Sequence, residues 1–238
     1  MKFSQVQKLA NPHKAYPEDP YSRLIRFIGL PFVWLSVLLK VPADALTWAQ
    51  IPAILLSAYF YSIGSYNFAV VGLLFLVLFD FLDKIDGAVA RCAGKFSFPM
   101  WYLDLFLDHF FSAPLIYLGI SLGVFFSTQN ILFLYLGIAV IIGYFLFESA
   151  VNTSYKLYVL ARKLPAKHPA LRKKSNFQFV KNFVRYMYMP PASTMFIALF
   201  TLFNRLDWYL LFFGITFPLL AIFNAFYEGK IAVKNVKN

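Results

Sequence analysis

Long apolar stretches alternate with short polar connections along most of this chain. Six stretches approach the ~20 apolar residues that a helix needs to cross ~30 Å of hydrocarbon. They are Leu46–Ile63, Phe68–Ala90, Met100–Phe125, Ile131–Ser149, the shorter Pro191–Phe203, and Trp208–Tyr227. The pattern therefore predicts an all-α integral membrane protein with six transmembrane helices.

The segment ahead of the first apolar stretch has a different pattern. Tyr21–Lys40 has a body of Leu, Ile and Phe, but it also carries charges and is interrupted by Pro31. Because Arg26 and Lys40 leave too few uncharged residues between them for a span, we expect an amphipathic helix at the membrane interface. Asp44, which precedes the first apolar run, is expected to be the N-cap of the first span.

These elements divide the chain into three regions. Residues 1–43 form an N-terminal region with the interfacial helix, 44–229 a six-helix transmembrane domain, and 230–238 a basic tail. The transmembrane domain includes a basic segment at 150–188. We expect this segment mainly to set topology and attract anionic lipid headgroups, and one or two of its cations to bind phosphate near a functional site.

Basic residues fall almost entirely on one side of the predicted bundle. Of the 22 Lys and Arg, only Arg205 lies on the side of the short connections at 64–67, 127–130 and 204–207. Under the positive-inside rule the opposite, basic side is cytoplasmic. We therefore expect both termini to be cytoplasmic, in what we take to be a prokaryotic cell membrane.

Composition agrees with a location in the bilayer. Hydrophobic residues make up 60% of the chain and charged residues 14%, with a mean hydropathy of +0.63. A soluble domain carries about 25% charged residues. The single cysteine, Cys92, excludes an internal disulfide, and the first 19 residues lack the apolar core of a cleavable signal peptide.

Two pairs of aspartates interrupt the second and third apolar stretches near their cytoplasmic ends. Asp83 and Asp86 are three residues apart, and Asp104 and Asp108 are four apart, so each pair lies on one helix face. Asp86 and Asp104 both lie about five residues, or ~7 Å, from the intervening turn. Four carboxylates at matched depth predict a site for one or two Mg²⁺ or Mn²⁺ ions, which prefer oxygen ligands.

Other interpretations of the acidic residues were weighed against a metal site. Lys84 or Arg91 can neutralise one acid by forming an ion pair, but these two cations cannot neutralise all four. Asp80 lies one turn deeper on the face of Asp83, where a supporting or proton-sharing role is expected rather than metal ligation. The small residues that follow Asp86 fit either close helix packing or the close approach of a ligand, and their place beside four acids favours the ligand.

The segment from Asp83 to Asp108 resembles the signature of the CDP-alcohol phosphotransferase family of membrane enzymes. Seven of its eight defining positions match over 26 residues, with the same four aspartates and with Gly87, Ala90 and Arg91 between them. The eighth position is a glycine in the family and Met100 here. More loosely, Asp44-Ala45-Leu46-Thr47 lies where the family often has Pro-Asn-x-Leu-Thr, and the predicted spans fit the family's arrangement.

The resemblance implies an activity. The family transfers a substituted phosphate group from a CDP-linked alcohol to a second alcohol and releases CMP. By analogy, all four aspartates lie at the metal site, and Asp108 is the catalytic general base on the acceptor hydroxyl. The nucleotide-binding positions are Gly87, Ala90, Arg91 and Met100. Met100 adds bulk to the nucleotide site but leaves the metal ligands unchanged.

The expected reaction builds phospholipids. We expect a CDP-diacylglycerol-type donor, or its ether-lipid counterpart, and a small polar alcohol such as inositol phosphate, glycerol phosphate or serine as acceptor. Membrane lipids are further partners, and no nucleic acid is expected. The resemblance also implies a homodimer, and Gly119-x3-Gly123 offers a helix contact between subunits or within one. The alternatives are a catalytically impaired family member that binds lipid and a divalent-cation transporter.

Overall fold

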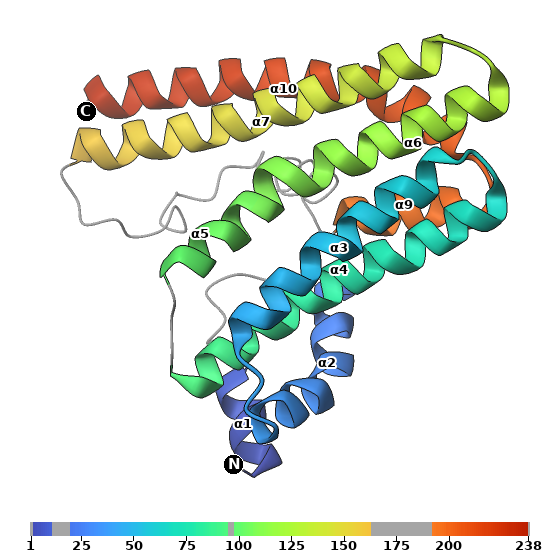
Figure 1. The fold of residues 1–238 in the computed structure, drawn as a ribbon. Helices are drawn as coiled ribbons and strands as arrows, with labels where there is room; N and C mark the ends of the chain where they lie inside the picture. Colours follow the sequence, from blue (N-terminus) through green and yellow to red (C-terminus); the bar gives the residue numbers. More distant parts are fainter. Residues whose placement is uncertain (1, 11–19, 95–97, 163–191, 238) are drawn as a thin grey trace.

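The protein is all-helical throughout the part of the chain that the structure describes. The computed structural model describes residues 2–10, 20–94, 98–162 and 192–237, and no strand occurs in these ranges. The helices, shown in Figure 1, are α1 (Phe3–Ala10), α2 (Pro20–Leu38), α3 (Ala43–Ser62), α4 (Tyr66–Ala93), α5 (Phe98–Phe106), η1 (Leu107–Phe111), α6 (Ser112–Thr128), α7 (Leu132–Arg162), α9 (Ala192–Leu202) and α10 (Leu206–Lys237). The predicted fold class is therefore confirmed at the level of helical secondary structure.

Three of these helices contain a stretch long and apolar enough to cross a membrane. The stretches are Tyr21–Leu38, Leu132–Ser149 and Leu206–Phe226, while Ser112–Thr128 and Ser193–Leu202 are apolar but shorter. The three long apolar stretches indicate that the chain is a membrane protein. The full set of six spans stays a prediction. Tyr21–Leu38 is the segment expected to lie at the interface, and because it also satisfies the length and composition of a span, its interfacial position stays a prediction.

Each apolar stretch found in the sequence corresponds to helix, but one predicted boundary is wrong. The helix α3 begins at Ala43 and its N-cap is Pro42, so Asp44 lies inside the first turn and is not the cap. Pro42 has extended backbone angles (φ −68°, ψ 141°), which let the helix start directly after it. In the first turn, the Asp44 carboxylate still interacts favourably with the positive end of the helix dipole.

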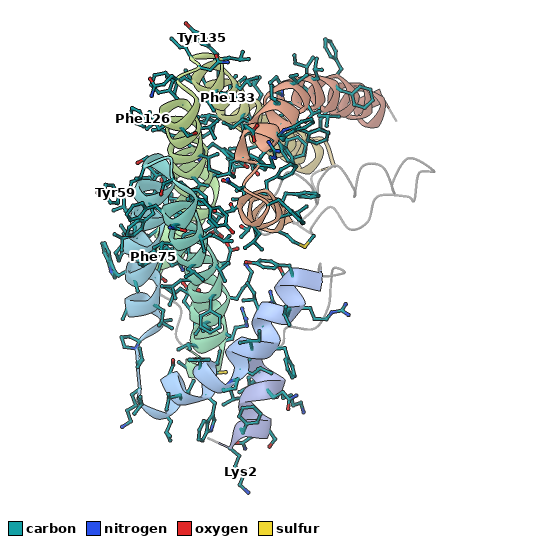
Figure 2. All side chains as sticks on the ribbon, turned by 90° about the vertical axis from the view of Figure 1, so that its right-hand side faces the viewer. Lys2, Tyr59, Phe75, Phe126, Phe133 and Tyr135 are labelled. Atoms are coloured by element: carbon teal, nitrogen blue, oxygen red, sulfur yellow. The ribbon has the colours of Figure 1, made fainter. Side chains whose placement is uncertain are left out.

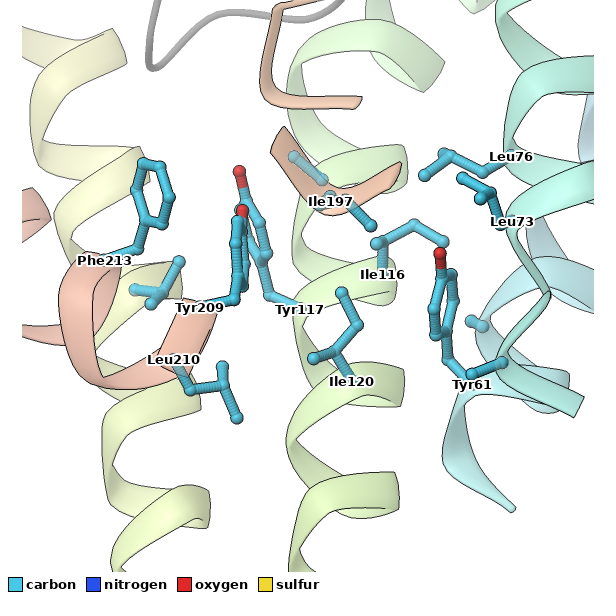
Figure 3. Close-up of a cluster of buried hydrophobic side chains, with 14 of the residues drawn as sticks. Tyr61, Leu73, Leu76, Ile116, Tyr117, Ile120, Ile197, Tyr209, Leu210 and Phe213 are labelled. Atoms are coloured by element: carbon cyan, nitrogen blue, oxygen red, sulfur yellow. The ribbon is translucent and has the colours of Figure 1, made fainter. Parts of the chain in front are cut away.

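The main hydrophobic core lies between α3, α4, α6, α7, α9 and α10. Figure 3 shows its centre, where Tyr117 and Tyr209 lie beside Phe213, and Tyr61 lies near Ile116. The Tyr61 hydroxyl is 3.1 Å from the hydroxyl of Thr201, which satisfies the polar end of a side chain only 1% exposed. This contact ties α3 to α9 across 140 residues of sequence.

The helices α3 and α6 approach each other at two glycines. A Cβ at Gly119 would lie 2.5 Å from the carbonyl oxygen of Ala58, and one at Gly123 would overlap the carbonyl of Tyr61. The Gly119-x3-Gly123 pair therefore serves packing within one subunit. The predicted homodimer has to use another surface.

Large apolar side chains cover much of the outer surface, as a lipid-facing surface requires. Figure 2 shows Tyr59, Phe126 and Tyr135 pointing away from the bundle, and they are 61%, 54% and 62% exposed. The α3–α4 and α6–α7 connections lie at the same end of the bundle in Figure 1. At that end Tyr66 donates to the carbonyl of Leu202, 3.4 Å away. The sequence predicts that this end of the bundle lies on the side of the membrane opposite the cytoplasm.

A second, smaller cluster joins α1 and α2 to the far half of α4, as the lower part of Figure 1 shows. Val6 of α1 is fully buried, and it packs with Leu30 and Val33 of α2 and with Ile85 and Val89 of α4. The N-terminal helices are thus packed directly on the helix that carries Asp83 and Asp86.

Candidate metal centre

Three of the four predicted aspartates come together. One carboxylate oxygen from each of Asp83, Asp104 and Asp108 lies within 4.8 Å of the other two. Asp83 comes from α4, Asp104 from α5 and Asp108 from η1. All three side chains are partly exposed, so the cluster is accessible. The sequence spacing predicts that all four aspartates converge, and the structure brings three of them within this distance.

Asp108 lies in a π-helical turn, which the sequence pattern did not predict. η1 spans Leu107–Phe111 between the α-helices α5 and α6. Two hydroxyl groups lie near the carbonyl oxygen of Asp108, that of Ser112 at 3.2 Å and that of Tyr144 at 3.5 Å, and both donate to it. Single π turns inside α-helices are often found at functional sites, because the wider turn changes where side chains point.

Asp86, the fourth aspartate, is held by α3. Its Oδ2 accepts hydrogen bonds from Thr47 Oγ1 at 2.7 Å and from Gln50 Nε2 at 2.8 Å, and its Oδ1 accepts one from the Gly87 amide. Asp86 is 4% exposed, more deeply buried than the other three. Its carboxylate nevertheless lies within the electrostatic influence of Asp104 and Asp83. Asp86 therefore borders the cluster with its orientation held by three neutral donors.

Lys84 partly offsets the negative charge of the cluster. Its ammonium group forms an ion pair with the Asp83 carboxylate. Asp108 is repelled by the charges of Asp83 and Asp104 and attracted by that of Lys84. Within the part of the chain that the structure describes, the ammonium group of Lys84 beside several carboxylates leaves net negative charge, which favours a cation at this position.

Asp80 does not join the three clustered carboxylates. It is 5% exposed, and its Oδ2 accepts a hydrogen bond from the Tyr21 hydroxyl of α2 at 2.9 Å. The Thr194 side chain of α9 also forms a hydrogen bond with Asp80. The carboxylate thus connects α2, α4 and α9, which agrees with the expected supporting role.

The predicted nucleotide-binding residues lie on the last turns of α4 and at the start of α5. The Arg91 guanidinium donates to the Ala10 carbonyl of α1 at 3.1 Å. A Cβ at Gly87 would lie 3.3 Å from a nitrogen of the same guanidinium group. Gly87 therefore leaves room for the arginine side chain, while Ala90 is partly exposed on the same helix. Met100 lies in α5, but its side chain falls outside the described residues.

One further prediction concerns residues beyond the described part of the chain. Residues 163–191 of the basic segment lie outside it, as do the side chains of 150–162. The phosphate-binding role expected for this segment therefore stays a prediction.

Thr47 and Gln50 are the site residues that sequence reasoning missed. They are 4% and 0% exposed in α3, and they lie three residues apart, on the helix face turned toward Asp86. Two polar residues with this spacing in a largely apolar stretch are the signal that could have indicated them. Gln50 Oε1 has no hydrogen-bond partner within the described part of the chain, so an acceptor remains beside Asp86.

The donor set fits a hard divalent cation. Carboxylate oxygens are the ligands that Mg²⁺ and Mn²⁺ prefer, and Asp83, Asp104 and Asp108 supply three within a short distance of one another. No protein-family model and no curated protein matches this chain. The family resemblance of the 83–108 segment therefore stays a prediction, while the carboxylate cluster defines a candidate site.

Proposed function

We propose that this protein is a phospholipid-synthesising transferase. It moves a substituted phosphate group from a CDP-linked lipid to a small polar alcohol and releases CMP. The observation that carries the proposal is the convergence of Asp83, Asp104 and Asp108 within 4.8 Å. These are three of the four aspartates in the segment that resembles the CDP-alcohol phosphotransferase signature.

Asp83, Asp104 and Asp108 hold Mg²⁺ or Mn²⁺ in this proposal, with Asp86 alongside. A metal ion held by these carboxylates would supply positive charge to offset the diphosphate of the donor and the CMP leaving group. Asp108 accepts the proton of the acceptor hydroxyl as that oxygen attacks the phosphorus atom. Thr47 and Gln50 keep Asp86 in one orientation, and Lys84 limits the repulsion between Asp83 and its neighbours.

The nucleotide occupies the region of Gly87, Ala90, Arg91 and Met100 in this proposal. The guanidinium group of Arg91, which lies against Gly87, supports this assignment, because an arginine can donate two parallel hydrogen bonds to a phosphate. The donor is a CDP-diacylglycerol or an ether-lipid equivalent, and the acceptor is an alcohol such as inositol phosphate, glycerol phosphate or serine.

The proposed topology has six spans, an interfacial helix ahead of them, and both termini and the active site in the cytoplasm. The distribution of Lys and Arg supports it, since only Arg205 falls on the opposite side. A water-soluble nucleotide then reaches the carboxylates from the cytoplasm while the lipid chains remain in the bilayer. We also propose that the protein resides in the cell membrane of a prokaryote. It forms a homodimer there.

The activity is tested with purified protein in detergent, radiolabelled CDP-diacylglycerol, Mg²⁺ and a panel of alcohols. We expect release of CMP with one acceptor class and none after removal of Mg²⁺ by EDTA. Asp108→Asn is expected to lower the rate about 10²–10⁴-fold, the usual loss of a general base. Asp207→Asn is the matched control, since Asp207 lies in the first turn of α10, in the helix that begins at the opposite end of the bundle.

Two further results discriminate the alternatives. If Met100→Gly releases CMP where the wild type does not, the wild type is a catalytically impaired member of the family. If no acceptor supports CMP release in either protein and proteoliposomes show Mg²⁺ or Mn²⁺ flux, the transferase proposal is wrong and the carboxylates serve transport.

A further inference from the structure

The short N-terminal helix α1 packs on the end of α4 that carries the predicted nucleotide-binding residues (Figure 1). Val6 is fully buried there and Ala10 is 4% exposed. The ring of Phe3 packs edge-to-face against Trp34 of α2, with ring centroids 6.3 Å apart. A helix of eight residues is not stable alone in water, so α1 depends on these contacts for its own order.

The last residue of α1 contacts Arg91 of α4. The final carbonyl groups of a helix have no partner within it, and the Ala10 carbonyl accepts a hydrogen bond from Arg91 Nη2 at 3.1 Å. The guanidinium cation thereby lies at the negative end of the α1 dipole. The thiol of the neighbouring Cys92 donates to the Val6 carbonyl, 3.9 Å away. Two consecutive residues of α4 therefore contact the docked α1.

The contact with α1 also places the guanidinium group relative to the proposed site. Its Nη1 lies 3.3 Å from the position that a Cβ of Gly87 would take, while its Nη2 contacts Ala10. Gly87 directly follows Asp86, the carboxylate that borders the metal centre. Arg91 is exposed, and a long exposed side chain loses rotamer freedom when it binds a ligand. Holding the guanidinium in place beforehand lowers that cost and so raises affinity.

We propose that α1 positions Arg91 for the nucleotide. In this inference the docked α1 holds the guanidinium group in the orientation that receives a phosphate of the donor. Ala10 acts through its backbone carbonyl and is a positioning residue, since only Arg91 touches the ligand. The inference rests on the proposed function, because it takes a CDP-linked donor as the ligand of Arg91. The opposite effect, competition between the Ala10 carbonyl and the phosphate, predicts the opposite change in affinity.

Val6→Asp tests the inference by undocking α1, because an unpaired charge at a fully buried position is strongly disfavoured. Cys92 reports the undocking independently of the ligand, since it is the single cysteine of the chain and lies against α1. We expect a maleimide to label Cys92 faster in Val6→Asp than in the wild type. Calorimetric titration with CDP and Mg²⁺ is expected to show affinity about tenfold lower, the loss typical of a charge-assisted hydrogen bond.

A double-mutant cycle separates positioning of Arg91 from general damage to the fold. Arg91→Gln alone is expected to weaken CDP binding about tenfold or more. Adding Val6→Asp to Arg91→Gln is expected to change the affinity less than about twofold further, because the group through which α1 acts is gone. A purely structural role of α1 gives two losses that multiply instead.

Leu9→Asp is the matched control. It adds the same charge to α1 at a position that is 45% exposed, so α1 stays docked. We expect CDP affinity within about twofold of the wild type and an unchanged rate of Cys92 labelling. If Val6→Asp fails to fold, Val6→Ala replaces it, and it is expected to change labelling and affinity in the same directions by smaller amounts.

The inference is overturned if Val6→Asp speeds the labelling of Cys92 but binds CDP as the wild type does, or more tightly. Unchanged labelling overturns it as well, since α1 then does not cover Cys92, and so do multiplying losses in the cycle. In each of these cases the wild type still binds CDP and the proposed function stands. Failure of the wild type itself to bind CDP with Mg²⁺ overturns the proposed function, and this inference with it.

Discussion

At the scale of single residues, hydrogen bonds from Thr47 and Gln50 distinguish the environment of Asp86 from that of the other three aspartates. Both side chains donate to Asp86 from α3, whereas Asp83, Asp104 and Asp108 converge from the other side. Hydrogen bonds that orient a metal-site carboxylate commonly affect metal affinity nearly as much as the ligands do. Asp86 is therefore held ready beside the cluster rather than free to turn.

Thr47→Val removes one of the two side-chain donors to Asp86 while keeping the side-chain volume. We expect the affinity for CDP in the presence of Mg²⁺ to fall roughly tenfold, as for other residues that support metal ligands. Calorimetric titration with CDP measures the change. Thr216→Val is the matched control, since the Thr216 hydroxyl donates only to the Phe212 carbonyl on the exposed side of α10. Equal affinity of Thr47→Val and wild type would refute the orienting role of Thr47.

At the scale of helices, close packing of α6 on α3 sets the frame in which α4 and α5 meet. Gly119 and Gly123 let the two backbones approach, and the π turn η1 then joins α6 to α5. A shift of α6 against α3 therefore moves Asp108 relative to Asp83, because Asp108 lies directly before α6. The glycines act on the site through the position of a whole helix.

Gly119→Ala tests this packing. The added methyl group would meet the Ala58 carbonyl oxygen at 2.5 Å, and backbone cannot move aside as a flexible side chain can. We expect a loss of about 1–3 kcal/mol in unfolding free energy, typical of overpacking, despite the better helix propensity of alanine. The change is read from unfolding in detergent followed by tryptophan fluorescence.

Gly29→Ala is the matched control for Gly119→Ala. It makes the same substitution inside α2, where the methyl group would meet only side-chain atoms, those of Ile85 at 3.4 Å and of Phe81 at 3.8 Å, which are ordinary contacts. We expect its stability to equal or slightly exceed that of wild type. If both variants unfold alike, close α3–α6 packing is not what the Gly119 position requires.

The sequence allowed the helices and the meeting of Asp83, Asp104 and Asp108 to be predicted, because both depend on local pattern and spacing. The contact of Thr47 and Gln50 with Asp86 could not be predicted, since it depends on how α3 is rotated against α4 over 36–39 residues of sequence. The π turn at Asp108 and the helix start at Pro42 depend on local backbone geometry that hydrophobic pattern does not encode. Tertiary packing likewise decided that Gly119 and Gly123 contact α3.

At the scale of the whole molecule, the carboxylates and the short connections lie toward opposite ends of the bundle. The turn after α4 at Gly94 follows the site, whereas the turn at Gly64 packs against Gly123 at the other end. The proposed orientation places the first of these ends in the cytoplasm. The single cysteine, Cys92, lies next to it and is partly exposed.

Cys92 makes this orientation measurable without other cysteines interfering. A membrane-impermeant maleimide is expected to label the wild type in inside-out vesicles and not in right-side-out vesicles. The double variant Cys92→Ser, Ser127→Cys moves the thiol to the α6–α7 end, and its labelling is expected to follow the opposite pattern. Labelling of both proteins from the same side of the membrane is incompatible with the proposed topology.

The most direct test of the central claim, that the clustered aspartates form a metal-dependent nucleotide site, is calorimetric titration of the purified protein with CDP, with and without Mg²⁺. We predict binding that requires Mg²⁺ and is lost in Asp83→Asn but kept in Asp207→Asn, which changes an aspartate in the first turn of α10. If CDP fails to bind, or binds equally without Mg²⁺ or in Asp83→Asn, the carboxylate cluster is not the nucleotide site and the account is contradicted.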